Sequence, residues 1–218
     1  NEILPSSSQE FDSPIPLQFM TDIKIVDNLL PQGYADQIER DLTQFQFPWY
    51  YADDVTYSGY NNNGGLAHLV YNFGNEPSSY YAFFKPIIYS IEAAHGVKIR
   101  DLLRIRVGML LTSSKPAEVY NTPHVDFTAN HYTACYYAND TDGDTVLFNE
   151  KLNDLVPQNT NITDEVIAHY TNNTKFTEAF RSPPKKNRVC IFDGLRFHSS
   201  SHPREHEKRF VITINYTA

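Results

Sequence analysis

Residues 188–216 read RVCIFDGLRFHSSSHPREHEKRFVITINY, and this stretch decides the fold. Its two ends, 188–193 and 209–216, are rich in Val, Ile, Phe and Thr, residues that favour strands. The Asp-Gly dipeptide at 193–194 is a turn former. The stretch therefore predicts two β-strands with a turn, a histidine (His198) and a polar loop between them.

Similar strand patterns extend from this stretch toward the N-terminus. Turn residues such as those of 139–143 separate them. The further predicted strands are 22–27, a short one at 66–72, 98–112, 119–125, 131–138 and 144–149. Aromatic residues make up 14% of the chain, and this composition also favours strands.

Two helical patterns precede the strand-rich half. One begins at Pro31, and its apolar residues recur every three or four positions: Tyr34, Ile38, Leu42 and Phe45. The other spans 79–95 and ends before Gly96, with Pro86 as a kink or as the true helix start. Two helices followed by many strands predict an α+β chain, mainly β, with helices packed on the outside of a β-sandwich or barrel.

The 218 residues are predicted to form one domain, because no linker or internal repeat divides them. Residues 1–20 are rich in Ser and Pro and are expected to be extended. Residues 150–184 form a polar insertion with a weak helical patch at 163–170. This insertion and the long Asn- and Tyr-rich loop 53–78 are candidate lids, since long loops are usually functional or mobile.

Charge and cysteine content exclude several classes of protein. The formal net charge is −8, so nucleic acid is an unlikely partner, and the basic run 185–188 is expected to be a solvated turn. No apolar run is long enough for a membrane span, and the first residues lack the pattern of a signal peptide. Cys135 and Cys190 are too few for a disulfide scaffold and are expected to be buried free thiols, although a bridge between them stays open. These features predict a cytoplasmic protein.

The tripeptide His124-Val125-Asp126 carries the main chemical signal. Residues i and i+2 of a strand point to the same face, so the imidazole and the carboxylate project together. Together with His198 they complete two imidazoles and one carboxylate, the facial triad that suits non-haem Fe(II).

A zinc site is the competing interpretation of the histidines. His198 and His202 are spaced H-x₃-H, and His206 and His131 are further candidates. The Ser- and Pro-containing segment between them offers no helix to align four ligands, so iron is favoured. The remaining histidines are expected to be structural or exposed: His68, His95 and His169.

Arg209 begins the last predicted strand and shares a face with Val211 and Thr213. A guanidinium on that face could bind a distant carboxylate in a bidentate fashion. A ligand with two carboxylates could then contact iron at one end and Arg209 at the other. Thr213 and Tyr137 would supply hydroxyl groups beside it.

These segments resemble a known family. His124-Val-Asp126, YTACYYAND at 132–140, PKKNRVCIFDGLRFHSSSHP at 184–203 and RFVITINY at 209–216 look like the 2-oxoglutarate- and Fe(II)-dependent dioxygenases. The prolyl-4-hydroxylase-like branch, with its compact bacterial and phage-type members, is the most similar. The resemblance covers roughly the C-terminal half.

The resemblance implies a double-stranded β-helix, also called a jelly roll or cupin-like core, with N-terminal supporting helices. It implies that His124, Asp126 and His198 bind iron, that Arg209 binds the 5-carboxylate of 2-oxoglutarate, and that Tyr137 and Thr213 contact the cosubstrate. Fe(II), 2-oxoglutarate and O₂ would be required, with ascorbate as an optional reductant.

The activity implied is hydroxylation of an unactivated C–H with release of succinate and CO₂, a prolyl or peptidyl substrate being favoured. A free amino acid, a small metabolite or a nucleobase is the alternative substrate, because one fold serves many reactions. A non-catalytic cupin-like binding module is the alternative of another class. The sequence predicts neither the residues that bind the substrate nor the oligomeric state.

Overall fold

The computed structural model describes residues 22–53, 64–114, 119–157 and 160–218. Within these ranges the strands are β1 (Ile23–Val26), β2 (Tyr50–Ala52), β3 (Gly65–Asn72), β4 (Asp101–Leu111), β5 (Tyr132–Tyr137), β6 (Thr145–Lys151), β7 (Glu178–Ser182), β8 (Arg188–Asp193), β9 (Arg196–Ser200) and β10 (Lys208–Thr217). The helices are α1 (Gln32–Thr43), α2 (Tyr81–His95), α3 (Leu152–Leu155) and α4 (Asp164–Asn173).

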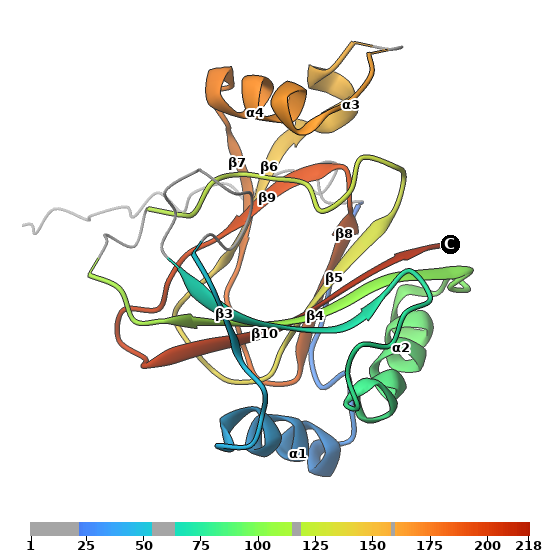
Figure 1. The fold of residues 1–218 in the computed structure, drawn as a ribbon, viewed down its shortest axis with the longest axis vertical. Coiled ribbons are helices and arrows are strands. Elements are labelled where there is room, and N and C mark those ends of the chain that lie inside the picture. Colours follow the sequence, from blue (N-terminus) through green and yellow to red (C-terminus); the bar gives the residue numbers. More distant parts are fainter. Residues whose placement is uncertain (1–21, 54–63, 115–118, 158–159) are drawn as a thin grey trace, which may run out of the picture.

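The strands form two antiparallel sheets that face each other (Figure 1). The large sheet has the order β1-β8-β5-β10-β4-β3-β2, and the small sheet has the order β7-β6-β9. The chain crosses repeatedly from one sheet to the other, because β4, β5, β8 and β10 belong to the large sheet and β6, β7 and β9 to the small one. This winding is a double-stranded β-helix, so the predicted, mainly β, fold is confirmed.

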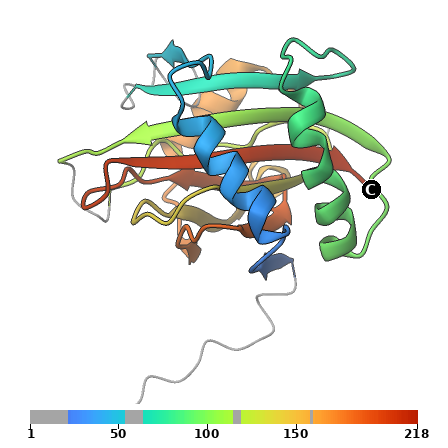
Figure 2. The same cartoon turned by 90° about the horizontal axis from the view of Figure 1, so that it is seen from below.

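Helices α1 and α2 cover the outer face of the large sheet (Figure 2). Helix α1 follows Pro31, whose fixed φ suits a helix start, and helix α2 ends at Gly96, which adopts a left-handed φ of 81°. Their buried faces are formed by Ala35, Ile38 and Leu42 in α1, and by Phe84, Ile87, Ile88 and Ile91 in α2. Packing of these apolar faces on the sheet builds the main core.

Strand alternation then decides what faces the interior between the sheets. In β10, Phe210, Ile212 and Ile214 belong to the core under the helices. Arg209 and Thr213 occupy the alternate positions of the strand and therefore point the other way, toward the small sheet. The large sheet thus presents an apolar face to the helices and a partly polar face to the interior.

Two sequence predictions need correction, and one alternative that the sequence left open is decided. Phe45 is 99% exposed, because α1 ends at Thr43 and the chain leaves the helical path before it. Pro86 lies inside α2 and is not its start. Residues 119–125 form no regular strand; of residues 119–127, only His124 makes a β-bridge, to His198 of β9. Pro123 has no N–H to donate, which explains the interrupted ladder.

Other elements were not predicted: β2, β7, β9 and α3. The insertion 150–184 contains β7, which pairs with β6, and helix α4, which extends the predicted patch 163–170. Thr163 caps α4, since its Oγ1 accepts a hydrogen bond of 3.4 Å from Val166 N. The predicted extended segment 1–20 lies outside the described residues, as do residues 54–63 of the predicted loop 53–78; β3 lies within the described remainder of that loop.

The basic run 185–188 is a turn, as predicted, but its side chains are paired. Lys185 and Arg188 contact Asp27, and Lys186 contacts Asp36 at 2.6 Å. Among the helices that the structure describes, none combines the length and the apolar character needed to cross a membrane.

The core allows a matched stability test with two phenylalanines. Phe84 is fully buried between α2 and the sheet, whereas Phe45 is solvent-exposed. Phe84→Ala is expected to lower the free energy of unfolding by about 3–5 kcal/mol, because it removes buried contacts and leaves a cavity. Phe45→Ala is expected to change it by less than about 0.5 kcal/mol. Urea unfolding followed by circular dichroism measures both; equal effects would contradict the packing described.

Cys135 and Cys190 are free and buried, and they lie directly opposite each other in β5 and β8. Burial raises the pKa of Cys135 from 9.0 to about 12 and also raises the pKa of Cys190. Because the thiolate is the reactive form, alkylation of Cys135 by iodoacetamide should be roughly a thousandfold slower in the folded chain than in urea. Mass spectrometry of the alkylated protein measures this, and rapid labelling of the folded chain would contradict it.

Candidate functional site

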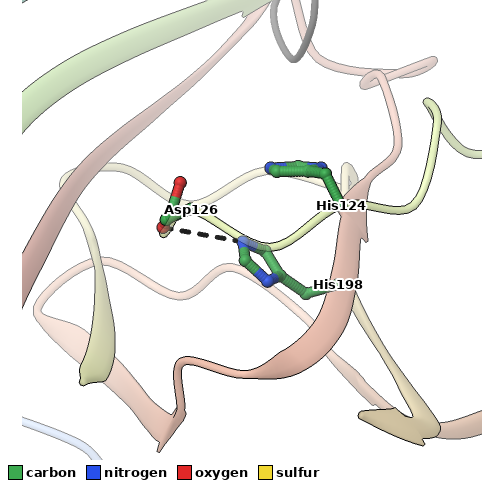
Figure 3. Close-up of side chains that lie close together, drawn as sticks. All are labelled: His124, Asp126 and His198. Atoms are coloured by element: carbon green, nitrogen blue, oxygen red, sulfur yellow. Dashed lines mark ion pairs between the residues drawn. The ribbon is translucent and has the colours of Figure 1, made fainter. Parts of the chain in front are cut away.

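The structure brings together the three residues that the sequence singled out (Figure 3). His198 lies on β9, and the chain around His124 is fixed to it by two backbone hydrogen bonds of 2.9 Å each. Asp126 follows two residues later. One ligand atom from each side chain lies within 4.8 Å of the other two, and Asp126 Oδ2 is 3.8 Å from His198 Nε2. This spacing allows all three to contact one ion.

Both imidazoles are oriented by backbone carbonyls. The Nδ1 of His124 is 3.1 Å from the carbonyl oxygen of Thr122, and the Nδ1 of His198 is 3.2 Å from that of Arg196. A proton on Nδ1 donates to each carbonyl, so the lone pair is on Nε2. Burial lowers the pKa of His198 and lowers that of His124 to about 3. Both rings are therefore neutral, the form that binds metals.

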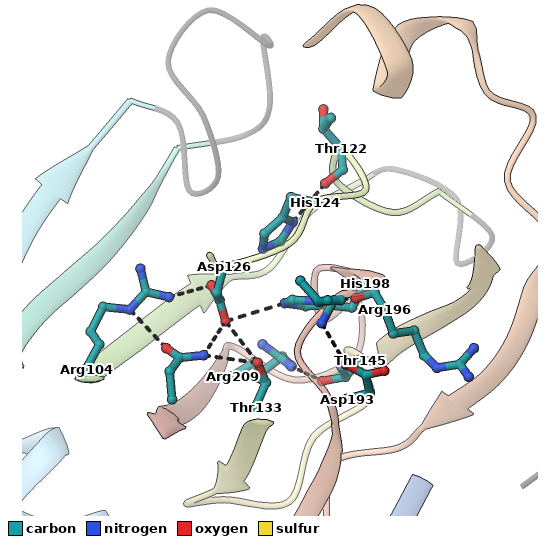
Figure 4. Close-up of polar contacts among 12 residues, drawn as sticks. Arg104, Thr122, His124, Asp126, Thr133, Thr145, Asp193, Arg196, His198 and Arg209 are labelled. Carbon is teal, nitrogen blue, oxygen red and sulfur yellow. Dashed lines mark hydrogen bonds and ion pairs between the residues drawn. The ribbon is translucent and has the colours of Figure 1, made fainter. Parts of the chain in front are cut away.

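Asp126 is held by partners on three strands of the large sheet (Figure 4). Arg104 Nη2 donates to Oδ1, and Asn215 Nδ2 donates to Oδ2 over 2.8 Å. Thr133 Oγ1 lies 3.5 Å from the same oxygen. Burial alone would raise the pKa of Asp126, but the charge of Arg104 and the neighbouring groups lower it. The carboxylate is thus ionised and fixed in position.

The sequence analysis did not identify Arg104 and Asn215. They face each other across β4 and β10, and Thr133 of β5 lies opposite Asn215 on the other side. Arg104 Nε also donates to Asn215 Oδ1 over 3.1 Å. The sequence did contain a signal for them: a charged residue and an amide residue lie within apolar strand patterns. Buried polar groups of this kind require hydrogen-bond partners. Their pairing depends on the strand register.

Arg209 is 2% exposed and faces the interior, not solvent. Its Nε donates to Gly143 O and its Nη2 to Thr145 Oγ1, both over 2.7 Å. A Cβ at position 143 would lie 2.7 Å from the carbonyl oxygen of Ser201, so this close approach requires glycine. In the described part of the chain, no carboxylate lies within ion-pair distance of Arg209. A buried cation of this kind suits a bound anion.

The three residues of the triad and Arg209 line one cavity. It encloses about 680 Å³, part of it open to solvent. Thr213, on the same face of β10 as Arg209, lines it as well. Tyr137 is fully buried, with its ring centroid 5.7 Å from the guanidinium carbon of Arg209. The structure therefore places Tyr137 against the arginine.

The histidines considered for zinc lie elsewhere. His206 Nδ1 is 2.9 Å from Asp142 Oδ1, His202 Nδ1 is 2.9 Å from Leu111 O, and His131 packs against Gly194. In the ranges that the structure describes, His124, Asp126 and His198 are the one group of three or more His, Cys, Asp or Glu side chains close enough to share an ion.

Comparison with known proteins gives matches in structure and none in sequence. No protein-family model and no curated protein sequence matches the chain. Among solved structures, the epimerase SnoN of nogalamycin biosynthesis, described as non-haem and α-ketoglutarate-dependent, has a TM-score of 0.58 and 15% identity, over 91% of this chain and 77% of SnoN. The chain has the fold of the 2-oxoglutarate/Fe(II) oxygenases.

Two further structures share this oxygenase fold. A prolyl hydroxylase from Trichoplax adhaerens, solved with a peptide fragment of hypoxia-inducible factor, has a TM-score of 0.55 and 15% identity, over 91% of this chain and 85% of that one. A 2-oxoglutarate/Fe(II) oxygenase family member from Burkholderia pseudomallei has a TM-score of 0.57 and 10% identity, over 90% and 85%. At these identities the similarity establishes the oxygenase fold.

The donor set fits iron and the cavity fits a dicarboxylate. Two neutral imidazoles and one carboxylate occupy one side of a metal ion and leave the adjacent positions for other ligands. Arg209, buried in the same cavity, offers a cation to an anionic group. Both features are observations on this chain and do not depend on the similar structures.

Proposed function

We propose that this protein is an Fe(II)- and 2-oxoglutarate-dependent dioxygenase. One observation carries the proposal: a two-histidine, one-carboxylate cluster shares a cavity with a buried arginine that has no carboxylate partner among the described residues. His124, Asp126 and His198 would bind the iron. Arg209 would bind the 5-carboxylate of 2-oxoglutarate, with Thr213 beside it and Tyr137 packed against the guanidinium.

The reaction proposed consumes O₂ and 2-oxoglutarate and yields succinate, CO₂ and a hydroxylated substrate. Bound iron supplies the activation of O₂ that cleavage of an unreactive C–H requires. The chain supplies geometry: Arg104 and Asn215 orient the Asp126 carboxylate, and carbonyl groups orient both imidazoles. The triad side chains are largely shielded from solvent, while the cavity that they line is partly open.

The finer proposal is a prolyl or peptidyl substrate. It is supported by the similarity to the Trichoplax prolyl hydroxylase, which was solved with a peptide. The insertion 150–184 and the loop 53–78 are proposed as lids, and residues 1–218 as one catalytic unit. The free thiols of Cys135 and Cys190 support a reducing, cytoplasmic setting.

The test is a titration of the whole chain with Fe(II) and 2-oxoglutarate under anaerobic conditions. A metal-to-ligand charge-transfer absorbance is expected, followed by succinate release once O₂ and a substrate are added. A binding module without catalytic function would release no succinate with any compound of a panel of proline peptides, amino acids and nucleotides. Absence of the absorbance band would contradict the proposal itself.

A further inference from the structure

A positively charged side chain contacts one of the proposed iron ligands. Arg104 Nη2 donates to Oδ1 of Asp126, whereas the other oxygen of that carboxylate, Oδ2, lies 3.8 Å from His198 Nε2 (Figure 4). The ion pair is largely buried, with 18% of the Arg104 side chain and 9% of the Asp126 side chain exposed. A charged contact in such a place is stronger than the neutral carbonyl contacts that orient the two imidazoles.

Three groups hold the guanidinium of Arg104 in place. The first is the carboxylate of Asp126 itself. The second is Asn215, whose Oδ1 accepts from Arg104 Nε over 3.1 Å. The third is the ring of Phe127, whose centroid lies 4.8 Å from the guanidinium carbon, within the range of a cation–π contact. The positive charge is therefore fixed beside the carboxylate.

Orientation of Asp126 does not by itself require an arginine. Asn215, which is neutral, donates to Oδ2 over 2.8 Å, and Thr133 Oγ1 lies 3.5 Å from the same oxygen. A neutral donor at position 104 would orient Oδ1 in the same way. An arginine adds a charge that persists when the side chain is buried. The orienting role described above does not use this charge.

A fixed positive charge beside a metal ligand acts unequally on the two oxidation states of iron. Fe(III) carries one positive charge more than Fe(II), so Arg104 repels it more strongly. The guanidinium also withdraws electron density from the carboxylate through the charge-assisted hydrogen bond, and a carboxylate weakened in this way stabilises Fe(III) less. Both effects raise the reduction potential and favour Fe(II), the oxidation state from which the proposed reaction starts.

We propose that Arg104 is a positioning residue with a second role: acting through Asp126, its charge raises the reduction potential of the iron and keeps the iron ferrous. The proposal rests on the proposed dioxygenase function. The step that Arg104 opposes is the loss of one electron from Fe(II) to O₂, which gives Fe(III) and superoxide. Ascorbate is the reductant that would return this electron.

The test is a redox titration of the iron-loaded chain, in which electron paramagnetic resonance follows Fe(III). Arg104→Gln removes the charge and is expected to lower the reduction potential by about 60–120 mV. This fall corresponds to a shift of roughly 10- to 100-fold from ferrous to ferric iron, the size expected when one unit charge is removed from a partly buried site. Arg104→Lys keeps the charge and is expected to retain most of the potential.

Asn215→Ala is the matched control for orientation. Like Arg104→Gln, it disturbs one hydrogen bond to Asp126, but it leaves the charge of the site unchanged. It is expected to weaken Fe(II) binding by about 10- to 100-fold and to leave the potential nearly unchanged. Arg204→Gln, at an exposed arginine, controls for removal of a positive charge elsewhere. Each titration uses an Fe(II) concentration that saturates the variant, as measured by anaerobic equilibrium dialysis.

The outcomes are separable. An unchanged potential in Arg104→Gln would overturn the proposal, as would an equal fall in Arg104→Lys or in Asn215→Ala, because geometry and not charge would then set the potential. An Arg104→Gln chain that is folded by circular dichroism but holds no iron would also overturn it, since Arg104 would then serve iron retention.

If Arg104→Gln does not fold, Phe127→Leu decides. It releases the guanidinium from the aromatic ring and keeps the charge in the chain, so a smaller fall in the potential is expected, and no fall would overturn the proposal. An unmodified chain that binds no Fe(II) would instead contradict the dioxygenase function on which this inference depends.

Discussion

Replacing any one of His124, Asp126 and His198 by alanine is expected to abolish substrate-dependent succinate release and to weaken Fe(II) binding by more than about a hundredfold. Loss of an outer partner of a metal ligand alone costs about 10- to 100-fold in affinity, so loss of a ligand should cost more. The three ligand atoms lie within 4.8 Å of one another, and each supplies one third of the proposed donor set. Anaerobic equilibrium dialysis with Fe(II) measures the affinity directly.

His169→Ala is the matched control, because His169 is exposed on α4. It should bind iron and release succinate like the unmodified chain. Circular dichroism of each variant separates loss of iron from loss of fold. If all three alanine variants bound iron with unchanged affinity, the candidate metal centre would be refuted.

Arg209→Met is expected to raise the Kd for 2-oxoglutarate by roughly 30- to 4,000-fold. This range corresponds to the 2–5 kcal/mol or so that truncation of one partner of a buried charge pair costs. Arg209→Lys keeps the positive charge but cannot form a bidentate pair of hydrogen bonds with a carboxylate, so an intermediate Kd is expected. Titration of the charge-transfer absorbance measures the Kd, while Fe(II) binding should stay unchanged because Arg209 does not belong to the triad.

Arg204→Met is the control for removal of a positive charge, since Arg204 is exposed. If Arg209→Met bound 2-oxoglutarate as tightly as the unmodified chain, the anchor would have to be another cation of the cavity. Arg106 would be the first candidate, and the same titration of Arg106→Gln would then decide.

The alternating pattern of 209–216 was sufficient to predict which face of this strand carries Arg209 and Thr213. The alternation of side chains between the two faces of a strand is a local property of the backbone, so it can be predicted without knowing the tertiary contacts. The donor types of His124, Asp126 and His198 were sufficient to propose them as one triad. Their common position follows from the crossing of the chain between two sheets, which the strand-rich second half of the sequence indicated.

The parts that were missed depend on tertiary contacts. Strands β7 and β9, EAFRS and RFHSS, are short and lack a clear apolar alternation, so pairing with β6 determines them. The segment 119–125 has a strand-like composition, but Pro123 interrupts its ladder and one bridge remains. The role of Arg104 could not be predicted because it depends on the register that sets Arg104 opposite Asn215.

The central place of β10 in the large sheet constrains how the protein can be made. Strand β10 pairs with both β4 and β5, although both precede it by a long stretch of chain. During synthesis, β4 and β5 leave the ribosome before β10, so the strand edges that later pair with β10 are at first unpaired. Unpaired strand edges can hydrogen-bond to other chains. Synthesis at high concentration should therefore favour aggregates of the nascent chain, and holding chaperones should raise the yield.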